Sequence, residues 1–290
     1  MDIPAIGETK ELDELARAHA PGAFSDLTAG ATHYRVTGPR DGRSVVLIHG
    51  IAGPMGIWDP LIQSLSYEHL SILQYDLYGR GYSDRPRLRY DVPLFLRQLE
   101  ELLAAASMTT PIVLVGWSLG AIIAASYAAE RPGMVDRLVL IAPAGIQVSL
   151  PTVSRVGILP ILGDVFMSLF GRRLVLRSVA RGLHIKSLQG DLRLLLQGQM
   201  LYKGYLRAFL ATLRSVGTMD ASQTYLRAGL ACPSVLMISG SHDPSIPGSV
   251  QLRMQHLIPS LVQCSIADAG HFPHFERPQE VSSQLHKFLQ

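Results

Sequence analysis

Gly116-Trp117-Ser118-Leu119-Gly120 joins two runs of opposite character. Before it, Pro111-Ile112-Val113-Leu114-Val115 is short and mostly β-branched, which predicts a buried parallel strand. After it, residues 121–130 are small, apolar and helix-favouring, and this run stops before Pro132-Gly133. Ser118 is therefore expected on a strand-to-helix turn.

The glycines on either side of Ser118 fit a very tight turn. Side chains two positions before and two positions after the serine would collide where the strand and the helix pass each other, and Gly116 and Gly120 occupy these positions. In such a turn the serine takes a strained backbone conformation that exposes its hydroxyl. The free N–H groups at the start of the helix would stabilise an anion formed above it. The pattern predicts a nucleophilic serine.

Strand and helix patterns alternate along most of the remaining chain. Strands are expected at residues 31–37, 44–48, 71–75, 135–141, 233–240 and 261–266, and helices at 9–19, 58–65, 95–105 and 281–289. This alternation predicts an α/β fold, in which a parallel sheet carries helices on both faces. The helix at 9–19 is charged and amphipathic, so we expect it to lie against the outside of the domain.

The alternation of strand and helix patterns stops after Gly145. From there to about Arg227 only helical segments are recognisable, rich in leucine, valine, phenylalanine and arginine. We therefore expect an α/β core made of residues 1–145 and 228–290, with a helical lid inserted at residues 146–227. Between Pro151 and Gly217 the lid is strongly basic, because it has only Asp164 and Asp191 against ten cations: Arg155, Arg172, Arg173, Arg177, Arg181, Lys186, Arg193, Lys203, Arg207 and Arg214.

Composition limits the classes of function. A formal net charge of +3 over 290 residues is too small to imply nucleic-acid binding, and no zinc-like spacing of cysteine and histidine is present. Cys232 and Cys264 are far apart in sequence, which favours buried thiols in a reducing compartment. The first residues have neither a basic start nor a long apolar run, so we expect no secretory signal, and the apolar stretch around 156–170 is too interrupted to span a bilayer. We expect a cytoplasmic protein, with peripheral membrane attachment as the alternative.

A serine nucleophile needs a base to take its proton and a carboxylate to orient that base. In an architecture that places the serine on such a strand-to-helix elbow, these groups follow the carboxyl ends of strands, in the chain order serine, acid, histidine. Asp243 and His271 follow the two strands after the predicted lid, in that order, so we assign them as acid and base. The competing residues receive other roles: Asp268 shapes its loop, His242 is a loop histidine, and His274, beyond Pro273, points elsewhere.

Acyl transfer also needs hydrogen-bond donors for the oxyanion, and loss of one donor costs about 3 kcal/mol in the barrier. The backbone N–H of Leu119, directly after the serine, is one expected donor. The backbone N–H of Ile51, in the glycine-containing loop after the 44–48 strand, is the other, while His49 holds the geometry of that loop. The side chains of Ile51 and Leu119 remain free to line the acyl pocket. We also assign Trp117 and Phe272, the neighbours of Ser118 and His271, to the substrate pocket.

Taken together, the motifs resemble the α/β-hydrolase fold serine hydrolases of the esterase and lipase type. The resemblance is carried by His49-Gly50, the Asp76–Ser83 loop, Gly116–Gly120, Asp243, and His271 with Glu276 and Pro278, and it covers the chain except its first twenty-odd residues. It implies a mostly parallel eight-stranded sheet, a triad of Ser118, Asp243 and His271, and a two-step acyl-enzyme mechanism with neither cofactor nor metal. Relatives that open epoxides or remove halogens carry aspartate at the elbow, so the serine disfavours those two chemistries.

Three functions stay open at this point. The first is a carboxylic ester hydrolase for small-molecule or lipid esters with apolar acyl groups. The second is a C–C bond hydrolase of ring-cleavage products, which is similar in triad and fold but usually carries a tryptophan soon after the histidine, where this chain has Phe272. The third is a non-catalytic ligand receptor, which typically loses a member of the triad.

The basic charge of the lid does not decide which partner the protein binds. Its arginines are either a solvated helix face or a surface that approaches an anionic membrane or an acidic acyl-carrier partner. The GWSLG elbow with a basic lid is similar to that of carrier-protein methyl ester esterases, and the Asp76–Ser83 loop with an apolar lid is similar to that of monoacylglycerol lipases.

Overall fold

A single eight-stranded sheet organises the computed structural model, which describes residues 5–65, 69–146 and 159–290. The strand order is β1-β2-β4-β3-β5-β6-β7-β8, and the strands are β1 (Ala23–Leu27), β2 (Gly30–Thr37), β3 (Arg43–Ile48), β4 (Leu70–Tyr75), β5 (Ile112–Trp117), β6 (Val135–Ile141), β7 (Val235–Gly240) and β8 (Val262–Ile266). Only β1 with β2 and β2 with β4 pair antiparallel; every other pair is parallel. The predicted α/β class and mostly parallel sheet are confirmed.

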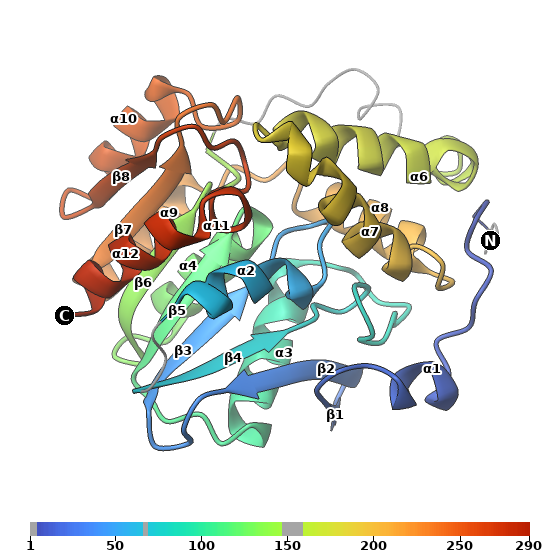
Figure 1. The fold of residues 1–290 in the computed structure, drawn as a ribbon, viewed down its shortest axis with the longest axis horizontal. Helices are drawn as coiled ribbons and strands as arrows, with labels where there is room; N and C mark the ends of the chain where they lie inside the picture. Colours follow the sequence, from blue (N-terminus) through green and yellow to red (C-terminus); the bar gives the residue numbers. More distant parts are fainter. Residues whose placement is uncertain (1–4, 66–68, 147–158) are drawn as a thin grey trace.

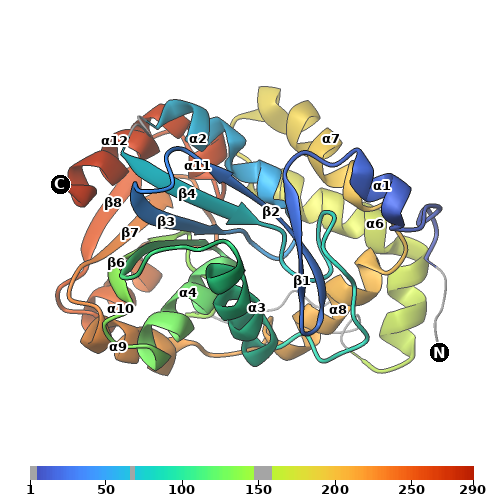
Figure 2. The ribbon, with the colours of Figure 1, turned by 90° about the horizontal axis from the view of Figure 1, so that it is seen from below.

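Helices cover both faces of the sheet, as the alternating pattern predicted. Figure 2 shows α2, α11 and α12 on one face and α3, α4, α9 and α10 on the other. The helices of these two layers are α2 (Asp59–Ser64), α11 (Pro273–Glu276), α12 (Pro278–Leu289), α3 (Val92–Ala105), α4 (Leu119–Glu130), α9 (Ser222–Ala231) and α10 (Gly248–Leu257), and a short 3₁₀ helix at Met55–Trp58 leads into α2. All residues of β5 are buried between the layers, which places the centre of the core under the predicted elbow.

A third group of helices lies beyond the carboxyl ends of the central strands (Figure 1). These cap helices are α6 (Leu162–Gly182), α7 (Gln189–Gln199) and α8 (Tyr205–Ser215), with a 3₁₀ turn at Lys186–Leu188. Between β6 and β7 the described residues form no strand of the sheet, in line with the helical pattern. Arg155 and the rest of residues 147–158 lie outside the described residues. No described helix combines the length and the apolar character that crossing a bilayer requires.

The amino-terminal segment differs from its prediction. The expected helix at 9–19 shortens to α1 (Glu14–Ala18), because Asp13 caps it by accepting a hydrogen bond from the Ala16 N–H. Before α1 the chain pairs with the cap helices instead: the Glu8 carboxylate accepts hydrogen bonds from the N–H groups of Gly204 and Leu206 at the start of α8. Strand β1 was not predicted, because its sequence, AFSDL, shows no clear alternation of polar and apolar residues.

Candidate active site

Ser118 lies on the tight turn between β5 and α4. Its backbone has φ 54° and ψ −112°, a left-handed conformation that non-glycine residues rarely adopt. The turn depends on the two glycines: a Cβ on Gly116 would lie 2.2 Å from the Gly120 carbonyl oxygen, and a Cβ on Gly120 would lie 2.1 Å from the Ile48 carbonyl oxygen. Both separations are too short for any side chain. The sequence motif therefore produces the strained turn that it predicts.

The structure brings Ser118, His271 and Asp243 together from three different loops. His271 Nε2 lies 3.2 Å from Ser118 Oγ, and His271 Nδ1 lies 2.8 Å from Asp243 Oδ2. The Asp243 side chain is fully buried and also accepts a hydrogen bond from the Ser245 N–H. Burial alone would raise the pKa of this carboxyl, but its hydrogen bonds and the charge of His271 together lower it. The arrangement orients a base toward the serine hydroxyl.

A single carboxylate fixes the loop that carries His271. Glu276 accepts hydrogen bonds from the Gly270 N–H in that loop and from the N–H groups of His184 and Ile185, just after α6. The His271 N–H donates to the Gly182 carbonyl at the end of α6, 2.7 Å away. Sequence reasoning named Glu276 only as part of the family pattern, because contacts across ninety residues leave no local signal.

The two residues whose N–H groups are the expected oxyanion donors, Ile51 and Leu119, line the same cavity as Ser118. Leu119 is the first residue of α4, so its N–H has no partner within the helix, and the Ile51 N–H has no hydrogen-bond partner among the described residues. His49 behaves as a structural residue: its Nδ1 donates to the Gly50 carbonyl and its Nε2 accepts from the Leu77 N–H. Burial lowers the pKa of His49 to about 4, which keeps this ring neutral.

A cavity of about 300 Å³ opens beside Ser118. Its walls are mostly apolar and come from the loops after β3, β5, β6 and β7 and from the end of α8; they comprise Ile51, Leu119, Ile122, Pro143, Ala144, Gly145, Ile146, Leu213, Val216, Gly217, Ser245 and Val250, together with Ser118 and His271. Ile51 and Leu119 are therefore among the residues that border the cavity. Such a lining suits an apolar group attached to a reacting carbonyl.

The assignment of Trp117 and Phe272 to the substrate pocket is wrong for this cavity, because neither residue lines it. Successive side chains of a strand point to opposite faces. Since Gly116 faces α4, Trp117 faces the other helical layer, where it packs against Phe272 and donates a hydrogen bond from Nε1 to the His271 carbonyl, 2.8 Å away. Both rings are almost fully buried, and they pack against the loop of His271 on the side away from the cavity.

His274 is excluded as a base by its surroundings. Its ring lies 4.4 Å from the Trp58 ring and 5.0 Å from the Trp117 ring, measured between centroids, and it is fully buried. Burial lowers its pKa to about 3, so the imidazole stays neutral. The prediction that His274 points elsewhere is confirmed.

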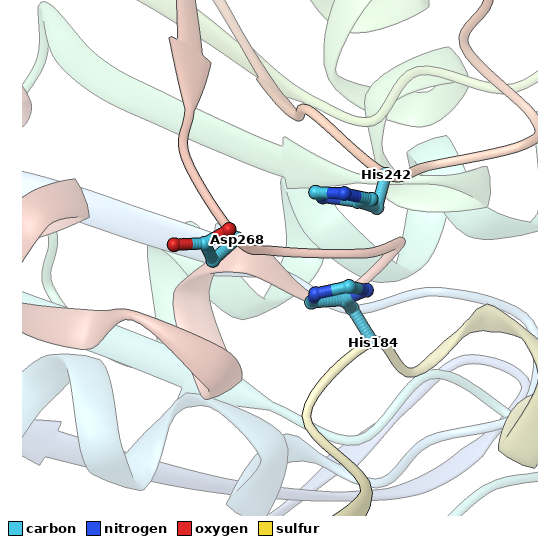
Figure 3. A group of neighbouring side chains, drawn as sticks. All are labelled: His184, His242 and Asp268. Atoms are coloured by element: carbon cyan, nitrogen blue, oxygen red, sulfur yellow. The ribbon is translucent and has the colours of Figure 1, made fainter.

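One group of possible metal ligands occurs among the described residues, and sequence spacing gave no sign of it. His184, His242 and Asp268 come from three loops near His271, and their ligand atoms lie within 4.8 Å of one another (Figure 3). The two imidazole rings, however, are stacked with centroids 3.9 Å apart and an interplanar angle of 18°. A metal binds an imidazole nitrogen in the plane of its ring, so two stacked rings do not direct their lone pairs at one ion. The group is a stacked histidine pair rather than a formed metal site.

Solved structures with the same fold include enzymes of several specificities. The enol-lactonase of Burkholderia xenovorans LB400 superimposes with a TM-score of 0.78 at 19% identity, covering 92% of this chain and 99% of that one. A meta-cleavage product hydrolase of Pseudomonas fluorescens IP01 superimposes with a TM-score of 0.72 at 21% identity, covering 92% and 97%. At these identities the likeness concerns the fold.

Sequence relatives extend over most of the chain. An uncharacterised protein of Mycobacterium tuberculosis is 29% identical over 270 residues, which cover 88% of this chain and 77% of the relative. A pimeloyl-[acyl-carrier protein] methyl ester esterase of Xylella fastidiosa is also 29% identical, over 262 residues that cover 86% and 95%. The model of the alpha/beta hydrolase family matches residues 45–284, which include the elbow and the loops of Asp243 and His271. This chain therefore belongs to the alpha/beta hydrolase family.

Proposed function

We propose that the protein is a serine carboxylic ester hydrolase that acts on esters with apolar acyl groups. The observation that carries the proposal is the hydrogen-bonded chain Asp243–His271–Ser118, which ends at a cavity of about 300 Å³ with mostly apolar walls. The family and the esterase among its relatives support a hydrolase of this kind.

The geometry supports a two-step reaction. Ser118 Oγ attacks the ester carbonyl carbon while its proton passes to His271 Nε2, and the N–H groups of Ile51 and Leu119 stabilise the resulting oxyanion. Collapse of this intermediate breaks the bond to the alcohol, which leaves with the proton from His271. Water, deprotonated by His271, then attacks the acyl-enzyme. The second collapse releases the carboxylic acid and returns the proton to Ser118.

A series of p-nitrophenyl esters from acetyl to palmitoyl tests the proposal. We expect a medium-length optimum, since the cavity is apolar but limited in volume, and we expect a fluorophosphonate probe to label the protein at Ser118. Labelling without turnover of any ester would shift the assignment to the second candidate, a C–C bond hydrolase, which the structural likeness to a meta-cleavage product hydrolase favours. Ring-cleavage dienones would then be the substrates to assay.

We further propose that the cap helices act as a lid whose basic face receives an acidic partner. Several cations of the cap helices are internally engaged: Arg214 pairs with Asp164, Lys203 with Glu11, and Arg207 donates to the Arg85 carbonyl. In contrast, Arg173 and Arg177 of α6 and Arg193 of α7 are exposed, surround a groove of about 280 Å³, and form no ion pair with a described carboxylate. Their charges are available to an anionic vesicle or an acidic acyl carrier.

Replacing Arg173, Arg177 and Arg193 together with glutamine should lower kcat/KM about tenfold on esters presented in anionic vesicles or on an acyl carrier, because electrostatic attraction accelerates association. Activity on soluble p-nitrophenyl butyrate should stay within about twofold of wild type. The charge-matched control replaces Arg40, Arg97 and Arg227, which are exposed on other parts of the molecule. Equal losses on soluble and presented esters, or equal effects of the two triple variants, would contradict the docking role.

A further inference from the structure

Arg80 is a fully buried cation whose hydrogen bonds lead to the loop of the expected oxyanion donor. It follows β4 in the Asp76–Ser83 loop, and its side chain is 0% exposed. Nε donates to the Ile51 carbonyl oxygen at 2.9 Å, Nη1 to the Tyr78 carbonyl oxygen at 3.1 Å, and Nη2 to Thr212 Oγ1 of α8 at 2.9 Å. Burial lowers its pKa to about 10, so the guanidinium remains charged at neutral pH.

The position of this charge needs an explanation, because buried charges are normally paired. Among the described residues no carboxylate forms an ion pair with Arg80. Its partners are instead two carbonyl dipoles and one hydroxyl, and the planar fork of a guanidinium can hold three such acceptors at fixed angles. A geometric role therefore accounts for the arginine better than a stabilising ion pair does.

The next carbonyl of the same loop is held equally firmly. Ala52 O accepts hydrogen bonds from Gln199 Nε2 at 2.7 Å and from the Tyr205 hydroxyl at 2.9 Å. Gln199 Oε1 in turn accepts from the Gly81 N–H, beside Arg80. Gln199 and Tyr205 are buried and belong to the end of α7 and the start of α8. Two consecutive carbonyls, those of residues 51 and 52, are thus bound by side chains that the cap helices supply or contact.

We propose that Arg80 is a positioning residue, which aims the Ile51 N–H at the oxyanion by fixing the Ile51 carbonyl, with Thr212 of α8 fixing the guanidinium. The inference rests on the proposed function. Because peptide units are planar, the Ile51 N–H turns together with the Gly50 carbonyl, which accepts a hydrogen bond from His49 Nδ1. Holding the following carbonyls, those of residues 51 and 52, fixes the chain on the other side of the Ile51 Cα, so rotation about the Ile51 backbone bonds is restricted from both sides. A preorganised donor contributes about 10²-fold to the rate, and a loosened one loses part of this factor. The junction of α7 and α8 accordingly holds the loop that carries Ile51.

The matched substitutions Thr212→Val and Thr212→Ser test the proposal. Valine has the shape of threonine but removes the hydroxyl that Arg80 Nη2 needs, whereas serine keeps it. We expect Thr212→Val to lower kcat about tenfold with KM within about twofold of wild type, and Thr212→Ser to restore most of the loss. Arg80→Lys, which keeps the charge but not the fork, should behave like Thr212→Val.

A transition-state analogue separates positioning from general damage to the fold. A trifluoromethyl ketone forms a tetrahedral adduct with the serine and occupies the oxyanion site, so its affinity should fall in proportion to kcat/KM in Thr212→Val and Arg80→Lys. The control Arg137→Met removes a half-buried arginine near the start of β6, remote from the elbow, which donates to Ser234 Oγ just before β7; this variant should leave both quantities unchanged.

Labelling of the wild type by a fluorophosphonate separates this inference from the proposed function. If the wild type is neither labelled nor active, the proposed function fails. If the wild type is labelled and active but Thr212→Val and Arg80→Lys keep wild-type kcat and analogue affinity, the positioning role is overturned. A rise in KM at unchanged kcat would overturn it too, because it would place the effect in ground-state binding.

Discussion

Replacing Ser118 with alanine is expected to lower kcat/KM for p-nitrophenyl butyrate by about 10⁵-fold, because the nucleophile of the acyl-enzyme step is lost. The substitution removes one oxygen atom and its hydrogen bond to His271 Nε2. The turn itself depends on Gly116 and Gly120, so the melting temperature should change little. Initial rates, measured together with circular dichroism melting curves, provide the test.

One result for the Ser118→Ala variant would contradict the assignment of Ser118 as the nucleophile. Retention of more than a small percentage of the wild-type rate, in protein shown by fluorophosphonate to lack any labelled residue, would mean that another group attacks the substrate. Gly133→Ala is the matched control for handling and purity, because a Cβ at Gly133 meets no atom within 4 Å, although its φ of +82° makes a small loss of stability expected.

Replacing Asp243 with asparagine is expected to lower kcat by about 10⁴-fold, because the amide keeps the shape of the carboxylate but no longer holds His271 in the tautomer that accepts the serine proton. The side chain is fully buried and lies 2.8 Å from His271 Nδ1, so the geometry should survive the change. Steady-state rates on one soluble ester measure the effect. A loss below tenfold would show that another carboxylate orients the histidine, with Asp268 the first to examine.

The same variant predicts how stability depends on pH. The pKa of Asp243 is lowered in the folded protein from a usual value of 3.8, so the ionised carboxylate stabilises the fold above that value and this contribution is lost as pH falls through the folded-state pKa. The difference in melting temperature between wild type and Asp243→Asn should therefore be largest near neutral pH and shrink below about pH 4. A difference that stays constant down to pH 3 would contradict the lowered pKa.

Local sequence rules were sufficient for the elbow and for most of the sheet. The two glycines around Ser118 determine the geometry of a turn formed by neighbouring residues, and the apolar composition of each strand is enough to predict that it is buried. Strand β1 escaped prediction because its pairing with β2 outweighs weak local preferences, and the start of α1 was predicted too early because the Asp13 cap sets it. Trp117 was misplaced although the alternation of β5 gives its direction once Gly116 is known to face α4.

Contacts between distant segments account for the features that the sequence did not predict. Arg80 reads as one more cation in a glycine-rich loop, and only the folded chain places it under Ile51 and beside Thr212. The stacked pair of His184 and His242 likewise joins the end of α6 to the loop after β7. Such arrangements arise from tertiary packing, which leaves no periodic trace in the chain.

The bonds of Glu276 have a practical consequence for engineering by recombination. Because one carboxylate holds both the histidine loop and the backbone at His184 and Ile185, a graft that exchanges the helices of this protein for those of a relative also exchanges part of the support of its base. A graft that leaves residues 182–185 native together with the histidine loop keeps these partners matched. A graft that replaces residues 182–185 but not Glu276 leaves the histidine loop with an unmatched anchor, whatever specificity the new helices bring.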